Sequence, residues 1–193
     1  VMPIKLAVEK ADLAQIPPLF PKSEHDGEAY EWLGKNIEGG RFSDVALDME
    51  VSAQRVVKEE TQAEDWDVQL PRFKLDFAFE GAKVTYNDTL MPAENGKGKG
   101  HLDLVAETLD ITEASATIGD IEGTDVAVKL TDLMTTGGGY VTVNVKAKGP
   151  VATALQYIAA EPIGMGEEEI GLNPKTVKGT IDAQVDIGLP TIK

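Results

Sequence analysis

The chain has 193 residues, which is enough for one domain with a core of its own. Its 33 acidic residues outnumber 18 basic ones and give a formal net charge of −15, so it would be repelled by nucleic acid and by an anionic membrane surface. It has no cysteine, which excludes disulfides and thiolate metal sites. No stretch approaches the roughly 18 to 20 apolar residues of a membrane-spanning helix, and none resembles a signal peptide.

The first forty residues predict one strand and one helix. Residues 4–9 alternate apolar and polar side chains as a strand does, and the proline-rich segment 16–21 can only be a connector. A helix is predicted at about 26–38, ended by Gly39 and Gly40. Its apolar positions recur at helical spacing: Ala29, Tyr30, Leu33 and Ile37.

From Arg41 onward the period of the apolar residues changes to two, which is typical of strands. Residues 53–71 are charged and predicted to be irregular, apart from a possible strand at 66–70. Gly81 is expected to separate two strands. The predicted strands are centred on 45–51, 75–79, 84–86, 102–104, 109–111, 114–118, 126–130, 141–147 and 181–189.

A second helix is predicted at about 150–161. Val151, Leu155 and Ile158 share one side of it, Pro150 suits its first position, and Pro162 ends it. A one-turn helix is expected within 171–179.

Two short helices cannot cover the apolar face of so many strands. The sequence therefore predicts a mainly β protein with two short helices (α+β), residues 1–193 forming a single module. Its sheet is expected to be curved and mostly antiparallel, with an apolar concave face that forms a groove.

No arrangement of residues predicts catalysis. His25 and His101 have no partner at ligand spacing, and the acidic clusters lack the pattern of a calcium loop. The segment Gly96–Gly100 resembles a phosphate loop only superficially, because Gly100 opens a strand, and it is predicted to be a flexible hairpin loop. We therefore expect a non-enzyme without a metal or cofactor.

Three segments, in their order along the chain, resemble a known family. They are residues 30–44 (YEWLGKNIEGGRFSD), residues 77–86 (FAFEGAKVTY), and the helix–linker–strand of residues 149–190. Together they resemble the YhdP-like members of the AsmA-like superfamily, bacterial envelope proteins related to TamB. The chain departs from the family pattern in having Leu19-Phe20-Pro21 where a Trp-Pro pair is usual before the first helix.

The resemblance implies a fragment of a longer protein of repeated β-modules, anchored in the inner membrane of a diderm bacterium and extending through the periplasm. Such a protein is a bridge-like lipid transfer protein, whose hydrophobic groove carries phospholipid acyl chains toward the outer membrane. The implied partners are acyl chains and the adjacent β-repeats. Contact with membranes would be made by other parts of the parent chain.

The candidate residues of the groove are apolar side chains from the predicted strands. Each could line a groove or belong to a core covered by helices, and the sequence leaves both open. An alternative function is a structural or protein-interaction domain of the envelope without lipid transport. The candidates are Leu47, Met49, Leu75, Phe77, Phe79, Leu104, Val126, Val128, Val143, Val145, Val185 and Ile187.

Overall fold

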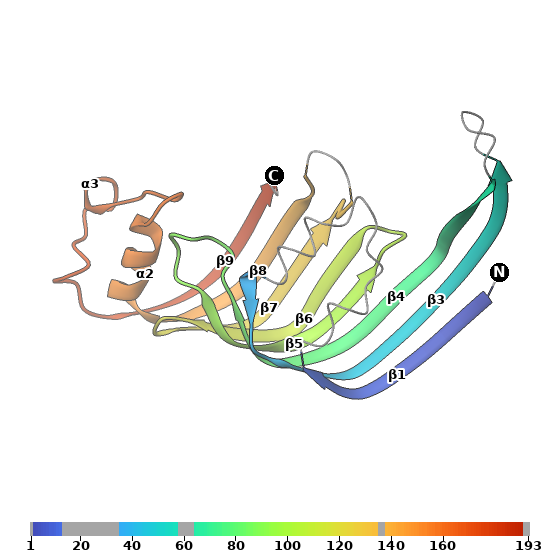
Figure 1. Cartoon of the computed structure of the whole chain (residues 1–193). Helices are drawn as coiled ribbons and strands as arrows, with labels where there is room; N and C mark the ends of the chain where they lie inside the picture. The colour runs from blue at the N-terminus through green and yellow to red at the C-terminus, as the bar shows by residue number, and fades with distance from the viewer. Residues whose placement is uncertain (1, 13–34, 58–63, 135–137, 191–193) are drawn as a thin grey trace.

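The computed structural model describes residues 2–12, 35–57, 64–134 and 138–190, and these contain one curved antiparallel sheet (Figure 1). The strand order is β1-β3-β4-β5-β6-β7-β8-β9, with the short β2 paired to β4. This confirms the predicted fold class of a mainly β chain with an antiparallel sheet. The strands are β1 (Met2–Asp12), β2 (Ile37–Glu38), β3 (Arg41–Val57), β4 (Glu64–Val84), β5 (Ala93–Asp103), β6 (Thr108–Ile118), β7 (Ile121–Thr131), β8 (Tyr140–Pro150) and β9 (Thr180–Pro190).

The register brings one apolar residue from every strand of the main path into a single line. Each member lies directly opposite the next on the neighbouring strand, so that all side chains of the line share one face. We call this line the leucine row. It consists of Leu6, Leu47, Leu75, Leu102, Leu109, Leu130, Val141 and Leu189.

Bulges interrupt β3 to β7, the strands at the centre of the sheet. At five places the register shifts beside an inserted residue with positive φ. Such insertions bend a strand and increase its twist, in keeping with the curvature seen in Figure 1. They also keep apolar residues on one face: with Glu113 inserted, Ile111 and Ala114 both stay in the face of the leucine row. The inserted residues are Asp44, Gly81, Asn95, Glu113 and Asp125.

Two of the predicted strand breaks are bulges within continuous strands. Gly81 does not separate two strands, because β4 continues through it to Val84. Residues 109–111 and 114–118 likewise form a single strand, β6. A bulge and a strand end both interrupt alternation by one residue, so a period-two pattern cannot distinguish them.

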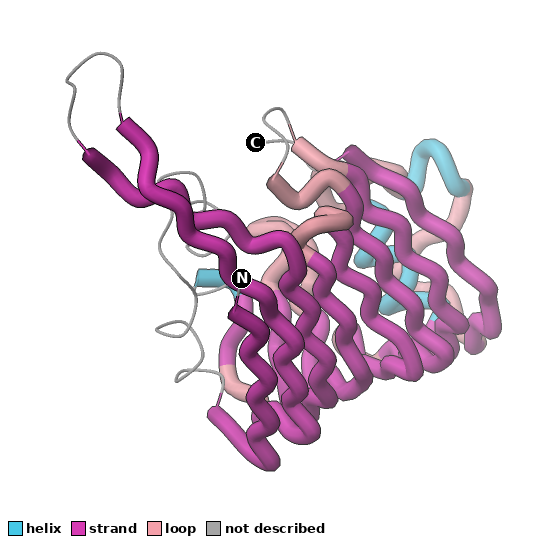
Figure 2. Tube along the Cα trace, turned by 90° about the vertical axis from the view of Figure 1, so that its right-hand side faces the viewer, coloured by secondary structure: helices cyan, strands magenta, loops and turns pink. Residues whose placement is uncertain are grey.

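The β3–β4 ribbon extends beyond its neighbours and is seen as a projecting pair of strands in Figure 2. β1 pairs with β3 only as far as Val51, and β5 pairs with β4 only from Lys74. In this ribbon, residues 53–57 belong to β3 and residues 64–71 belong to β4, which corrects the prediction of an irregular segment. Cross-strand contacts such as that of Arg55 with the ring of Trp66, 5.5 Å from its centroid, help to stabilise the pairing.

The segment 96–100 is also strand rather than loop. β5 begins at Ala93 and includes all three of its glycines. Gly98 and Gly100 lie directly opposite Phe79 and Phe77 of β4. Large cross-strand neighbours thus compensate for the weak strand propensity of glycine.

Most of the helix predicted at 26–38 lies outside the described residues, including Ala29, Tyr30 and Leu33. Lys35 and Asn36 are helical, but Ile37 and Glu38 form β2 and pair with Val84 and Lys83. The prediction was therefore wrong at its end. The carbonyl of Asn36 accepts the N–H of Thr85 at 2.8 Å, and Gly39 and Gly40 then turn the chain with φ of 63° and 90°.

Helix α2 (Val151–Ala159) confirms the second predicted helix. Pro150 is not its first residue but the last of β8, with the extended backbone angles φ −64° and ψ 135°. The one-turn helix is α3 (Glu167–Ile170), before the segment where it was expected, and it ends at Gly171 with φ 73°. None of the helices within the described ranges combines the length and apolarity needed to cross a membrane.

The sheet is open rather than folded around a dense core. Of the described apolar residues only Phe73, Ala82, Ala114 and Leu155 are buried, and none of the large side chains falls below 2% exposure. The chain exposes 12908 Å², whereas a compact protein of 20.7 kDa would expose about 8,900 Å². Much of the apolar side-chain surface therefore remains accessible.

Candidate functional site: the apolar face of the sheet

The face opposite the leucine row is polar and carries ion pairs between neighbouring strands. Guanidinium nitrogens of Arg72 lie 3.2 Å from carboxylate oxygens of Asp48 and of Glu50. The Nζ atom of Lys74 lies 3.1 Å from a carboxylate oxygen of Asp103. Such partly exposed pairs add little stability, but they keep this face hydrated. The two faces of the sheet therefore have opposite chemistry.

The candidate residues named from the sequence converge on the other face. All except Leu104 lie on strands of the main path, either in the leucine row itself or on the same side of the sheet, two or four residues along the strand from it. Leu104 follows the end of β5, where its N–H donates to the carbonyl of Phe73 at 3.1 Å and extends the ladder by one residue. None of the candidates is buried, and Ile187 remains 39% exposed.

A second lateral line lies next to the leucine row on the apolar face. Ile111, Val128, Val143 and Ile187 face one another in succession, beginning from the Phe77–Gly100 pair. The apolar face is thus continuous from strand to strand. We call the side of the sheet that carries these two lines the apolar face.

Sequence reasoning missed several residues of this face. Leu6, Leu130, Val141 and Leu189 belong to the leucine row but were not among the candidates. Their alternation with polar neighbours could have identified them as well as it identified Val143. Phe42 was also missed, because the bulge at Asp44 interrupts the alternation that would have linked it to Leu47.

Three aromatic rings contact one another on the apolar face near β4 and β5. The rings of Phe42 and Phe77 meet edge to face with centroids 5.1 Å apart, and those of Phe77 and Phe79 are 6.3 Å apart. Phe77 extends over Gly100, because a Cβ atom built on that glycine would overlap the tip of the ring. The absence of a side chain on Gly100 is what lets the ring lie there.

One end of the sheet is joined to α2 by a set of hydrogen bonds. The hydroxyl of Tyr86 donates to the carbonyl of Met91 at 2.7 Å and lies 2.9 Å from the hydroxyl of Tyr157 on α2. Partial burial and the neighbouring Tyr157 raise the pKa of Tyr86 well above its ordinary value. The hydroxyl of Thr89 donates to the carbonyl of Glu161, just beyond the helix.

The ionisable groups of the sheet serve its turns and its polar face. The backbone N–H of Ala106 holds the pKa of Asp103 below its usual range, helped by Lys74 and by the N–H of Val105. His101 lies on the polar face with Nδ1 2.6 Å from Asp76, and His25 falls outside the described residues. Among the side chains that the structure describes, no three acidic, histidine or cysteine groups are placed to hold a metal ion.

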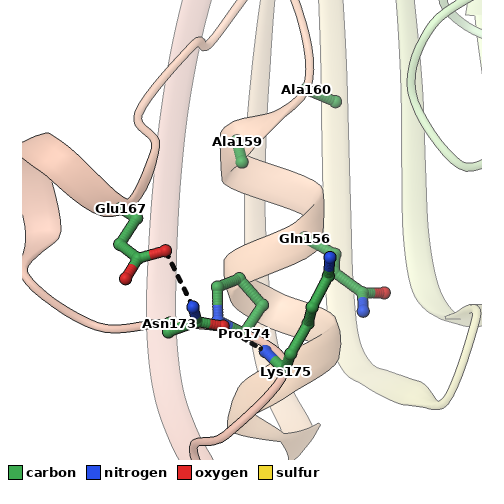
Figure 3. A pocket seen from close by; sticks show the side chains of 7 residues that line it. All are labelled: Gln156, Ala159, Ala160, Glu167, Asn173, Pro174 and Lys175. Atoms are coloured by element: carbon green, nitrogen blue, oxygen red, sulfur yellow. Dashed lines mark hydrogen bonds between the residues drawn. The ribbon is translucent and has the colours of Figure 1, made fainter.

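A cavity of about 410 Å³ lies between α2 and the chain that follows it (Figure 3). Its polar groups are engaged with one another: Asn173 donates to Glu167 at 2.9 Å and accepts the backbone N–H of Lys175 at 2.8 Å. These bonds shape the loop. Its lining residues are Gln156, Ala159, Ala160, Glu167, Asn173, Pro174 and Lys175.

No family model, curated protein or solved structure matches this chain. The resemblance to the AsmA-like superfamily therefore stays a prediction, and the geometry of the sheet is the basis on which a function can be argued.

Proposed function

We propose that this chain is a segment of a bridge-like lipid transfer protein of the AsmA-like type, whose apolar face lines the concave side of the sheet and carries phospholipid acyl chains. The observation that supports the proposal is the lateral continuity of the apolar face. The leucine row runs through every strand of the main path, from β1 to β9, without a polar interruption.

The energetics of such a surface suit an acyl chain. Exposing a methylene to water costs about 0.8 kcal/mol, so a sixteen-carbon tail costs roughly 12 kcal/mol. With strands about 4.8 Å apart, the leucine row is about 34 Å long, whereas a lipid tail spans about half of a 30 Å bilayer core. A tail could therefore keep its apolar contacts while moving along the row.

The directions of the two edge strands are compatible with the proposal that this chain is part of a longer β-structure. The strands of the main path alternate in direction from β1 to β9, so these two edge strands run antiparallel to each other. A neighbouring module in the same orientation could pair with either edge and continue the antiparallel pattern. Pairing would also satisfy backbone groups that an open edge leaves to water.

The proposal includes no catalytic step, metal or cofactor. It places the chain in the periplasm, within a parent protein anchored in the inner membrane by segments outside this sequence. The polar face would keep the module in water, and the net charge of −15 would hold it away from anionic headgroups.

Lipid extraction tests the proposal. The purified chain is incubated with phosphatidylethanolamine and phosphatidylglycerol vesicles, reisolated, and its bound lipid is quantified by mass spectrometry. The informative variant is Val143→Asp on the apolar face. The matched control is Thr142→Asp, at the preceding residue of β8, which lies on the polar face beside Lys129. We expect wild type and the control to carry lipid and Val143→Asp to lose most of it, because a charge on this face disfavours a tail.

The competing function is a structural or protein-interaction β-domain of the envelope, which edge strands such as β1 and β9 also suit. A wild-type chain that carries no lipid and instead forms sheet-edge assemblies would favour it. Equal lipid content in the two aspartate variants would also reject the groove, since binding would then not depend on the apolar face.

A further inference from the structure

We infer that Gly100 sets the depth of the apolar groove by letting the ring of Phe77 lie down on the sheet, which leaves room above it for an acyl chain. The inference rests on the proposed function and identifies a positioning residue within that site. Gly100 would act only through the ring that it accommodates.

The geometry at this pair is specific. Gly100 and Phe77 lie directly opposite each other on β5 and β4. A Cβ on Gly100 would overlap Cζ of Phe77 and would lie 2.5 Å and 2.7 Å from Cε2 and Cε1. These atoms form the far end of the ring, so the ring occupies the space that a side chain at position 100 would need.

The ring has little room to move sideways. Phe42 meets it edge to face at 5.1 Å, and Phe79 lies 6.3 Å away, centroid to centroid. A methyl group at position 100 would therefore displace the ring away from the sheet, on the side of the apolar face. The displaced ring would stand in the path proposed for the acyl chain.

The neighbouring glycine plays a different part. A Cβ on Gly98 would lie 3.1 Å from Cζ of Phe79, but only 2.7 Å from Cβ of Ala114 and 3.1 Å from its Cα. Ala114 is buried and cannot rotate away, so a substitution at Gly98 would strain the sheet itself. Gly100 is the position where the neighbouring side chain yields instead.

Gly100→Ala is the test, because φ at this residue is not positive and alanine is compatible with a strand. Gly188→Ala is the matched control. A Cβ on Gly188 would overlap the hydroxyl of Tyr140, which makes it another glycine that accommodates an aromatic side chain, but on the polar face. The double variant Gly100→Ala/Phe77→Leu removes the obstruction by shortening the displaced side chain.

The measurement is the Kd of the delipidated chain for the fluorescent fatty acid cis-parinaric acid, with circular dichroism and thermal melting as checks of the fold. We expect Gly100→Ala to weaken binding by about fourfold for each methylene that loses its contact. Gly188→Ala should bind as wild type does, and Phe77→Leu should restore binding to Gly100→Ala.

The outcomes distinguish the role of Gly100 from the existence of the groove. If wild type binds the probe and Gly100→Ala binds it equally well, the depth-setting role is wrong while the groove stands. A loss in Gly100→Ala that Phe77→Leu does not rescue, or an equal loss in Gly188→Ala, also overturns the role. If wild type binds neither the probe nor phospholipid, the groove itself fails and the inference fails with it.

Discussion

The openness of the apolar face can be tested by making one substitution in two surroundings. Leu6 belongs to the leucine row on β1 and is 51% exposed, whereas Leu155 on α2 is 6% exposed. Truncating either leucine to alanine removes the same carbon atoms. Any difference in the loss of stability must then come from the environment.

The expected costs follow from these exposures. A Leu→Ala change removes about 2.4 kcal/mol of transfer free energy at about 0.8 kcal/mol per carbon group. Leu6→Ala should lose about half of this, near 1.2 kcal/mol, because water already reaches the site and no cavity is left. Leu155→Ala should lose nearly all of it and add a cavity term, for a total of about 3 kcal/mol.

The assay is urea unfolding of the delipidated chain followed by far-ultraviolet circular dichroism, with the m-value checked for each variant. Adding saturating lipid should raise the cost of Leu6→Ala but leave that of Leu155→Ala unchanged. If Leu6→Ala costs as much as Leu155→Ala without lipid, the apolar face is sealed in solution. The groove would then be refuted.

Three further predictions concern the rest of the fold. Tyr86→Phe should cost about 1 kcal/mol of unfolding free energy, because the hydrogen bonds of the hydroxyl are lost. Because the pKa of Tyr86 is raised above the ordinary value of 10.0, the number of tyrosines that titrate near 10.0 should be the same in wild type and in this variant. Asp103→Ala should destabilise the chain at neutral pH. Because the folded-state pKa of Asp103 lies below its ordinary 3.8, its contribution is present above that pH and is lost as pH falls through the lowered pKa. Glu113→Val should cost about 2 kcal/mol, because a β-branched residue does not tolerate its φ of 50°.

Each of these has its own check. Alkaline absorbance titration measures the phenols, and the loss of one that titrates near 10.0 in Tyr86→Phe would contradict the assignment. The stability difference for Asp103→Ala is followed by urea unfolding as the pH is lowered, and it should shrink. Thr112→Val, the preceding position in the same strand, is the control for Glu113→Val. Equal costs at these two positions would mean that the left-handed backbone is not the cause.

Local pattern predicted the existence of most strands but not their ends. Alternation around Leu47, Leu75 and Val143 identified strands correctly, because a period of two reports which side chains face apolar surroundings. It failed at Gly81 and in the Gly96–Gly100 segment, where strands continue through residues of low strand propensity. The β5 glycines are stabilised by phenylalanines of another strand, and no local signal records such a partner.

The candidate site shows the same division. The sequence supplied apolar residues that could line a groove or fill a core, and it left that choice open at every position. The structure places them on one face, where none of the candidates is buried, and aligns them with residues that were not chosen, such as Leu6 and Leu189. Burial depends on what packs above the sheet, which is a property of the tertiary structure.

By itself, the order of residues determined that this chain forms amphipathic strands with a short helix after β8, because side-chain alternation and helix-ending prolines act over a few neighbours. Only the tertiary structure decided that the leucines form one row, that bulges bend the strands without turning their apolar side chains over, and that Phe77 rests on Gly100. These features depend on the register between strands distant in sequence, and register is set by the whole sheet.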